Sequence, residues 1–284
     1  MHTRRDFLTT LGAALVASGC SRALGQPAAV VPMSRRLPQL GIQLYTERSL
    51  MSKDVEGTLA KIAEIGYNEV EFAGYFGRTP AQIRAVLDAN HLTSPSTHTA
   101  LPASDDAWAR ALDEAAAIGH QWIVIAYLEA SERKSPGDWQ RLATRFNTLA
   151  AKAQERGLRF AYHNHDFEFT RVGTGTGLDV LISQTDSRLV DFEMDLYWVV
   201  KAGADPLALI EQYPRRFPLM HVKDASAAPA LSIVDVGRGT IDFARIFARA
   251  DTSGMQHTYV ENDEPVDAIE SARTSYRYLT DLRY

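Results

Sequence analysis

Short apolar runs alternate with longer amphipathic stretches along most of the chain, from Gly41 to the C-terminus. The expected strands are residues 41–45, 69–72, 94–98, 122–127, 159–163, 189–195, 218–222 and 258–261. Strands that alternate with helices are typical of parallel sheets whose strands are joined by helical crossovers. Eight such units in one domain predict closure into a single (β/α)8 TIM barrel, a fold that takes about 250 residues.

Helices are expected between these strands because apolar residues recur there at helical spacing. The clearest candidates are residues 54–65, a segment from Pro80 toward Asn90, and residues 107–118 and 139–156. Glycines that end a helix follow three of them, at Gly66, Gly119 and Gly157. An open doubly wound sheet is the alternative, but neither the turn after the first strand nor the glycine-rich stretch 173–177 has a dinucleotide-binding spacing.

The first forty residues have a different pattern. Arg4 and Arg5 precede an apolar, small-residue run from Leu11 to Gly19, which resembles a twin-arginine export signal. The run is shorter than the roughly 20 apolar residues that span a bilayer. We therefore predict a signal at residues 1–20, a proline-containing linker at 21–39, a barrel at 40–284, no transmembrane span, and a periplasmic or exported location.

The only cysteine, Cys20, follows residues 16–19, which resemble a lipobox in which Ala17 stands where leucine is usual. Lipid attachment at Cys20 and plain cleavage nearby both stay open. One sulfur cannot pair within the chain, so a disulfide framework is excluded. Without residues 1–19 the chain has 28 basic and 34 acidic residues, an acidic balance that argues against a nucleic-acid partner.

Polar residues end four of the later strands. His163, Asp195, His221 and Glu261 are separated by 32, 26 and 40 residues, each about one strand and one helix. The carboxyl ends of barrel strands meet at one rim, so we expect these four to hold one metal ion. Mixed imidazole and carboxylate ligands suit Mn²⁺, our first expectation, or Zn²⁺, Co²⁺ or Fe²⁺, and suit Mg²⁺ less.

The choice of ligand on the fifth strand stays open. His163 and His165 lie on the same side of the strand, so either one faces the metal while the other touches substrate. Glu168 is a further candidate. The structural alternatives are a packed histidine at His221, a helix cap at Asp195, and exposed loop charges at Glu261 and Glu168.

Several fragments then carry a resemblance. They are Gln43-Leu44-Tyr45, Val70-Glu71-Phe72, His221-Val222-Lys223-Asp224, residues 236–243 and Val260-Glu261. In this order, over about 240 residues, they resemble the xylose isomerase-like sugar phosphate isomerase/epimerase family. Epimerases of that family usually bind the metal with two glutamates, one aspartate and one histidine, and the two glutamates move the proton.

Three of this chain's residues match that ligand set, namely Asp195, His221 and Glu261, whereas His163 stands where the first glutamate is expected. The departure disfavours simple two-glutamate epimerisation. The histidine-rich strand end instead resembles inosose dehydratases of the same superfamily. The resemblance to exported relatives of these dehydratases implies cleavage of 3-keto-glycosides by the same elimination.

The resemblance implies proton removal beside a carbonyl that a metal polarises, through an enediolate. The expected general base is Glu261, His163 or His165. Lys223 would steady the oxyanion or form a salt bridge to Asp224 or Glu261. The residues expected to contact substrate are Gln43, Glu71, His98 and Glu168.

We therefore predict a divalent-metal-dependent isomerase or epimerase whose partner is a non-phosphorylated sugar or keto-sugar, because sugar phosphates are not expected outside the cytoplasm. The main alternative is a lyase that eliminates a β-substituent from a 3-keto-glycoside or an inosose. A phosphodiester hydrolase of the apurinic-site endonuclease type is disfavoured by the acidic balance. A non-catalytic sugar-binding protein and a homo-oligomer also stay open.

Overall fold

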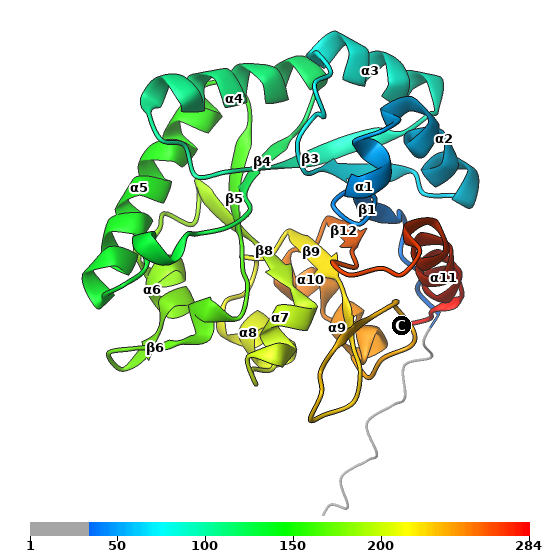
Figure 1. Cartoon of the computed structure of the whole chain (residues 1–284). Helices are drawn as coiled ribbons and strands as arrows, with labels where there is room; N and C mark the ends of the chain where they lie inside the picture. Colours follow the sequence, from blue (N-terminus) through cyan, green and yellow to red (C-terminus); the bar gives the residue numbers. More distant parts are fainter. Residues whose placement is uncertain (1–33) are drawn as a thin grey trace, which may run out of the picture. The chain divides into compact units, whose positions relative to one another are not determined.

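The computed structural model describes residues 34–284, and within them eight parallel strands close into a barrel (Figure 1). Around the barrel the order is β1, β12, β9, β8, β5, β4, β3 and β2. Their bounds are Gly41–Gln43 (β1), Glu69–Phe72 (β2), Thr93–Thr99 (β3), Trp122–Ile125 (β4), Arg159–His163 (β5), Val190–Asp195 (β8), Leu219–Val222 (β9) and His257–Val260 (β12). This arrangement confirms the predicted (β/α)8 barrel.

Helices surround the strands, which lie at the centre of Figure 1. The α-helices are Arg48–Met51 (α1), Val55–Ile65 (α2), Pro80–Ala89 (α3), Asp105–Ile118 (α4), Pro136–Gln154 (α5), Gly177–Gln184 (α6), Leu196–Lys201 (α7), Pro206–Gln212 (α8), Phe243–Phe247 (α9), Ala250–Ser253 (α10) and Ala268–Asp281 (α11). The remaining short elements are the 3-10 turns Ala130–Glu132 and Phe167–Phe169 and the strand pairs Arg171–Val172 (β6) with Gly175–Thr176 (β7) and Asp224–Ala225 (β10) with Ile233–Val234 (β11).

The sequence signals at helix ends act as expected. The Asp54 side chain accepts a hydrogen bond from the Gly57 amide at the start of α2, and Thr79 and Gln82 form a capping box at the start of α3. Gly119 ends α4 with φ at 93°, a conformation that glycine adopts without strain. The first strand stops at Gln43, earlier than predicted, because the Thr46 amide folds back to the Gln43 carbonyl.

The barrel interior has polar side chains toward both ends and an apolar layer between them. This layer is a small apolar cluster, separate from the main core, that plugs the barrel and is made of Trp122, Val124, Ala161, Leu219 and Tyr259. A Cβ on Gly41 would lie 2.5 Å from the Tyr259 ring, so the close packing of this plug requires glycine there. The main core lies between sheet and helices. Inside the barrel, the buried carboxylates Glu69 and Glu71 lie on opposite sides of the plug.

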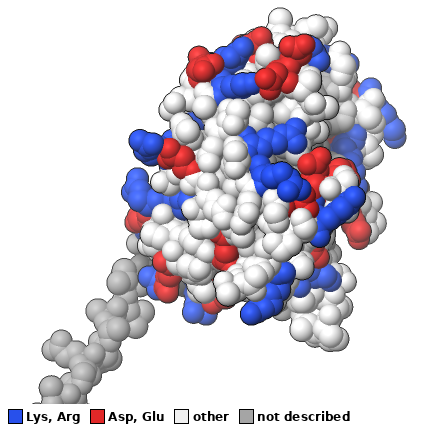
Figure 2. Space-filling model, turned by 90° about the vertical axis from the view of Figure 1, so that its left-hand side faces the viewer, with Lys and Arg blue, Asp and Glu red and all other residues white. Residues whose placement is uncertain are grey.

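The predicted signal, Cys20 and most of the predicted linker lie outside the described residues. Residues 34–39 form no helix or strand, and Arg35 exchanges two backbone hydrogen bonds with Tyr284, at 3.0 and 3.1 Å. Within residues 34–284 no helix combines the length and the apolar character that a bilayer crossing requires. Acidic and basic side chains lie next to one another over the face shown in Figure 2.

Candidate metal and substrate site

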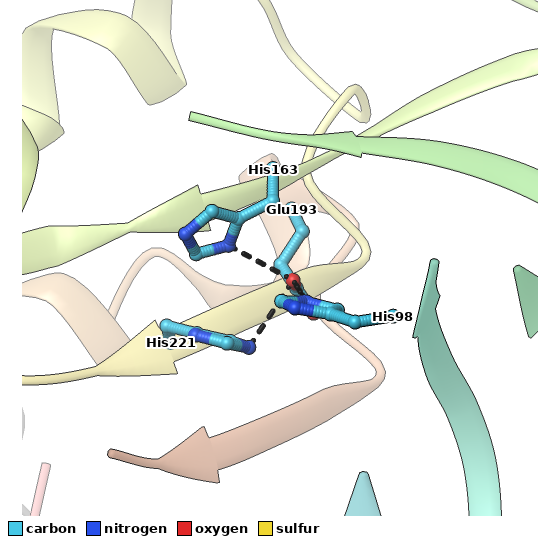
Figure 3. A group of neighbouring side chains, drawn as sticks. All are labelled: His98, His163, Glu193 and His221. Atoms are coloured by element: carbon cyan, nitrogen blue, oxygen red, sulfur yellow. Dashed lines mark hydrogen bonds and ion pairs between the residues drawn. The ribbon is translucent and has the colours of Figure 1, made fainter. Parts of the chain in front are cut away.

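Three imidazoles from different strands converge on one carboxylate (Figure 3). Oε2 of Glu193, on β8, lies 2.6 Å from Nε2 of His98, 3.0 Å from Nδ1 of His163 and 3.1 Å from Nε2 of His221. Glu193 and His221 are completely buried, and His163 nearly so. These four side chains therefore offer a compact set of nitrogen and oxygen donors at the carboxyl end of the barrel.

A second buried glutamate supports this set. Oε2 of Glu71 lies 2.7 Å from Nε2 of His221 and accepts a hydrogen bond from Nε2 of Gln43 at 2.8 Å. The Ser96 hydroxyl donates to the other oxygen of Glu71. Gln43 and Glu71, predicted as substrate contacts, thus bind each other and the imidazole cluster, and neither lines the cavity described below.

A lysine lies among three carboxylates on the cavity side of His221. Nζ of Lys223 is 2.8 Å from Oε2 of Glu261 and 3.0 Å from carboxylate oxygens of both Asp195 and Asp263. Nδ1 of His221 lies 2.6 Å from the same Glu261 oxygen. The predicted Lys223–Glu261 salt bridge is present, and Glu261 is buried rather than a solvated loop charge.

Two other residues have the structural roles considered for this region. Oδ1 of Asp195 caps α7 by accepting a hydrogen bond from the Trp198 amide at 3.0 Å, which leaves Oδ2 facing the site. Asp224 is not the partner of Lys223. Its carboxylate accepts hydrogen bonds from the amides of Gly237 and Gly239, at 3.0 and 2.9 Å. Asp224 therefore holds the loop that precedes α9.

The charges of the cluster follow from burial and from its neighbours. Burial lowers the pKa of His221, but the Glu193 and Glu261 carboxylates more than reverse this and raise it well above its usual value. Burial, and then the positive charge of His221, hold the pKa of His163 well below its usual value. Burial opposes ionisation of Glu261, yet Lys223 and His221 hold its pKa well below the usual range.

The donor atoms fit a divalent cation. They form two groups, within each of which the donor atoms lie within 4.8 Å of one another: His98, His163, Glu193 and His221 in one, and Asp195, His221 and Glu261 in the other. Oε1 of Glu193 and Oδ2 of Asp195 are buried without an aligned hydrogen bond, although the Lys223 ammonium lies 3.0 Å from the latter. Buried carboxylate oxygens and imidazole nitrogens are the ligands that such ions use, and a bound cation would take the place of the proton that the Glu193 and Glu261 carboxylates favour on His221.

The structure brings three predicted ligands, Asp195, His221 and Glu261, into one group and places His163 in the other. Sequence reasoning missed Glu193 altogether. The signal was available, because Glu193 lies two residues before Asp195 on one strand, and such residues point to the same face. His98, predicted as a substrate contact, both lines the cavity and belongs to the imidazole cluster.

His165 lies beside the cluster in an aromatic setting. Its ring stacks on Phe167 at 5.4 Å and meets the edge of Tyr127 at 5.1 Å. Nδ1 of His165 is buried without a hydrogen-bond partner among the described residues. Burial, and then the charge of Lys223, lower the pKa of His165 to about 3. The ring is therefore a neutral group on the cavity wall.

Glu168 does not join the metal-ligand candidates. Its carboxylate is fully buried, accepts hydrogen bonds from the Tyr162 hydroxyl and from the His165 amide, the latter at 2.8 Å, and does not line the cavity. Burial raises its pKa to about 7. Glu168 thus fixes the backbone that carries His165.

One cavity of about 900 Å³ opens over this site. Its inner end is formed by His98, His163, His165, Lys223 and Glu261. The charged side chains on its whole wall, histidines apart, are five acidic residues and two basic ones: Glu114, Glu129, Glu132, Glu261 and Asp263 against Arg145 and Lys223. The wall is therefore acidic overall.

Known proteins match this chain in sequence and in fold. An inosose dehydratase of Lacticaseibacillus casei is 27% identical over 208 residues, 66% of this chain and 66% of that protein, so the chain spans just under two thirds of its length. A sugar phosphate isomerase/epimerase from Parabacteroides distasonis, solved as a crystal structure, is 28% identical with a TM-score of 0.75, covering 90% of this chain and 98% of that one.

A further crystal structure, of the IolI protein with a zinc atom bound, has a TM-score of 0.68 at 13% identity, over 86% of this chain and 97% of that one. At that identity the likeness concerns the fold alone. The inosose dehydratase and the sugar phosphate isomerase/epimerase are enzymes by name, which supports the predicted isomerase, epimerase or lyase. Residues 59–282 match a family profile described as xylose isomerase-like TIM barrel, and this chain belongs to that family.

Proposed function

We propose that this protein is a divalent-metal-dependent enzyme that removes a proton beside the carbonyl group of a non-phosphorylated keto-sugar, through an enediolate. One observation carries the proposal. Buried imidazoles and carboxylates with unused oxygen atoms lie directly behind the inner end of a cavity large enough for a sugar, and His98, His163 and Glu261 of these donor groups line that end. Relatives that are dehydratases, isomerases and epimerases support a sugar-processing reaction of this kind.

His221 belongs to both donor groups, so it would hold the ion in either arrangement. Glu193 completes one group, and Asp195 with Glu261 completes the other. A bound divalent ion supplies a Lewis acid that polarises the substrate carbonyl and lowers the cost of negative charge on its oxygen.

His165 is the best-placed proton acceptor on the cavity wall. Its ring lines the cavity, and no hydrogen bond at Nδ1 fixes which ring nitrogen carries the proton, whereas Glu261 is already bound by His221 and Lys223. The Lys223 ammonium, in the same wall, places a positive charge where the substrate oxygen becomes negative. General acid–base catalysis by one such group typically contributes about 10²–10⁴-fold to the rate.

The acidic wall favours a substrate without phosphate. Five carboxylates face two basic side chains around the cavity, so a dianionic phosphate would be repelled and a neutral sugar would not. Elimination is the second candidate outcome. It is favoured by the inosose dehydratase relatives and by His163, which stands where the resemblance to the epimerases leads us to expect a glutamate.

The test combines metal analysis of the purified protein with an NMR time course on a methyl 3-keto-glucoside in D₂O. Deuterium at the carbon beside the carbonyl without cleavage would indicate an isomerase or epimerase, and free methanol with an unsaturated keto-sugar would indicate a lyase. The 6-phosphate of the same substrate is the matched control, and it should react much more slowly. A metal-free protein that neither exchanges nor cleaves would overturn the proposal.

We also propose that the protein is exported by the twin-arginine route, which the Arg4-Arg5 pair before an apolar run supports. Replacing both arginines with lysine should leave the protein in the cytoplasm of the fractionated cell. Replacing Cys20 with serine should release the mature protein from membranes if Cys20 is lipidated. Unchanged export of the double-lysine variant would contradict the proposal.

A further inference from the structure

The cavity extends well beyond the buried cluster. Small-molecule sites typically measure about 300–1,000 Å³, so a cavity of about 900 Å³ lies near the upper end of that range. Only its inner end is formed by the imidazoles and Lys223. The rest, called the outer arm here, lies between the segment after β3, residues 99–103, and the segment after β4, residues 126–132, with α4 behind it.

The outer arm differs chemically from the inner end. The side chains that give it an apolar character are Leu101, Pro102, Ala103, Ala111, Ile123 and Ala126. Among the residues that the structure describes, the large hydrophobic side chains that are exposed are Tyr45, Tyr127 and Val266. Both tyrosines line this cavity. An apolar surface with partly exposed aromatic rings on the same cavity wall is suited to an apolar or aromatic group.

The arm is preformed. The Arg145 guanidinium donates a hydrogen bond to the Pro102 carbonyl and lies 3.8 Å from the Glu132 carboxylate, so it joins the two segments that form the walls. Tyr127 is held by edge contacts with His165 and Phe167, at 5.1 and 5.3 Å between ring centres. A rigid site of this kind binds without a large ordering cost.

Charge limits what the arm accepts. Glu114, Glu129 and Glu132 line it against the single basic residue Arg145. Arg145 is already engaged by Pro102 and Glu132. An anionic group would therefore be repelled, and an uncharged one would not.

We propose that the outer arm binds the leaving group of a keto-glycoside, and that this group is uncharged and aromatic or otherwise apolar. The inference rests on the proposed function, because the inner end must hold the keto-sugar ring. The base takes the proton from the carbon between the carbonyl and the anomeric carbon, and that electron pair forms a carbon–carbon double bond. The bond from the anomeric carbon to the aglycone oxygen breaks, and the oxygen leaves with its electrons and gains a proton.

The products are an unsaturated keto-sugar and the aglycone alcohol. The substrate already carries the ketone, so the step needs no oxidant or reductant. A sugar without an aglycone would leave the outer arm unused. The arm therefore points to elimination as the outcome of the shared first step.

The test compares kcat/KM of the metal-loaded enzyme on benzyl and methyl 3-keto-glucosides. Both aglycones leave as primary alcohols of similar acidity, so their ratio reports binding in the arm rather than leaving-group chemistry. We expect the benzyl substrate to be favoured at least about tenfold, which corresponds to about 1.4 kcal/mol. A benzyl group with a para-carboxylate should lose that advantage, because the arm is acidic.

Ala111→Phe, on α4, should fill the arm and reduce the benzyl-to-methyl ratio toward one. Ala117→Phe is the matched control, because Ala117 lies exposed on the same helix and does not line the cavity. If Ala111→Phe does not fold, Tyr127→Ala removes an exposed ring and should lower the ratio as well. A wild-type ratio near one, or a ratio that neither variant changes, would overturn the inference. Failure of the proposed function would differ, because the methyl substrate would show neither exchange nor cleavage.

Discussion

Two glutamate–histidine pairs lie at opposite ends of the barrel and share one strand. Glu69 and Glu71 are two residues apart on β2 and both are buried. Toward the amino end, Oε2 of Glu69 lies 2.9 Å from Nδ1 of His257. Toward the carboxyl end, Oε2 of Glu71 lies 2.7 Å from Nε2 of His221. Residue types and distances are nearly the same, so the surroundings must distinguish the two pairs.

We call the amino-end pair closed because its imidazole, although slightly exposed, pairs with one carboxylate, that of Glu69, among the described residues. The His257 ring packs on the edge of Trp122 and stacks on Tyr259, at 5.3 and 6.3 Å between ring centres. We call the carboxyl-end pair open because the ligand atoms next to it are not all paired. His221 shares its two nitrogens among three carboxylates, and neighbouring carboxylate oxygens of Glu193 and Asp195 lack aligned hydrogen bonds. Unused ligand atoms beside a cavity, rather than the residue types alone, separate a binding site from a structural ion pair.

The largest effect is expected at His221, because it is the one residue that both donor groups contain. His221→Ala should lose the bound metal and reduce proton exchange by more than about 10³-fold, since the Lewis acid and the placement of Glu261 are lost together. Metal content by mass spectrometry and exchange in D₂O check both. A variant that keeps one metal ion per chain would show that the comparison of the two pairs does not locate the site.

Glu193→Gln and Asp195→Asn form a matched pair of neutral, nearly isosteric variants that distinguishes the two donor groups. The group that holds the metal should lose about 10–100-fold in metal affinity when its carboxylate is neutralised, the scale known for supporting groups of metal sites, or more for a direct ligand. The other variant should keep its affinity. Titration with Mn²⁺ and Zn²⁺ measures both. Equal losses would mean that one ion uses both carboxylates.

The sequence predicted the barrel because eight apolar runs alternate with segments of helical periodicity. This pattern can be recognised without knowing which residues are in contact. It also predicted that the polar residues would meet at one rim of the barrel, because the carboxyl ends of parallel strands all lie on the same side. Strand alternation puts Asp191, Glu193 and Asp195 on the same inward face, which made Glu193 a candidate, but a single strand does not tell which of the three faces the histidines. Asp191 instead accepts a hydrogen bond from the Trp122 indole and pairs with Arg159 at 2.7 Å. Which of the three carboxylates faces the histidines depends on the register between neighbouring strands.

Substrate contacts were harder still to predict. Gln43 ends β1 and Glu168 lies in the turn after β5, but Gln43 donates a hydrogen bond to Glu71 and Glu168 accepts one from the His165 amide. The outer arm left no pattern in the sequence, because its wall combines small residues from two loops and from one face of α4. Small apolar residues in loops carry little signal of their own, and only the fold brings them together.

A third prediction concerns pH and the support behind His165. Burial raises the pKa of Glu168 from 4.5 to about 7, so between these values the folded protein binds a proton that the unfolded chain does not. Stability therefore falls as pH rises through this range, by an amount on the order of 3 kcal/mol. Glu168→Gln is neutral at every pH, so its free energy of unfolding should not show this decrease.

Urea unfolding of wild type and variant at pH 5 and pH 7.5 measures the difference. Glu155→Gln, at an exposed site on the surface, is the control and should leave the pH dependence unchanged. An identical pH dependence in wild type and Glu168→Gln would mean that the carboxylate is ionised across the whole range.

The smallest effect is expected at the closed pair. His257→Gln keeps a donor for Glu69 but loses the ring that packs on Trp122, so the free energy of unfolding should fall by only about 1 kcal/mol. Metal content and proton exchange should match wild type, because the apolar plug of Leu219 and Tyr259 separates this pair from the site. Calorimetry and exchange in D₂O give the two readouts. A loss of activity much larger than the loss of stability would show that a change at His257 reaches the metal site through the plug. The two ends of the barrel would then have to be treated as one site.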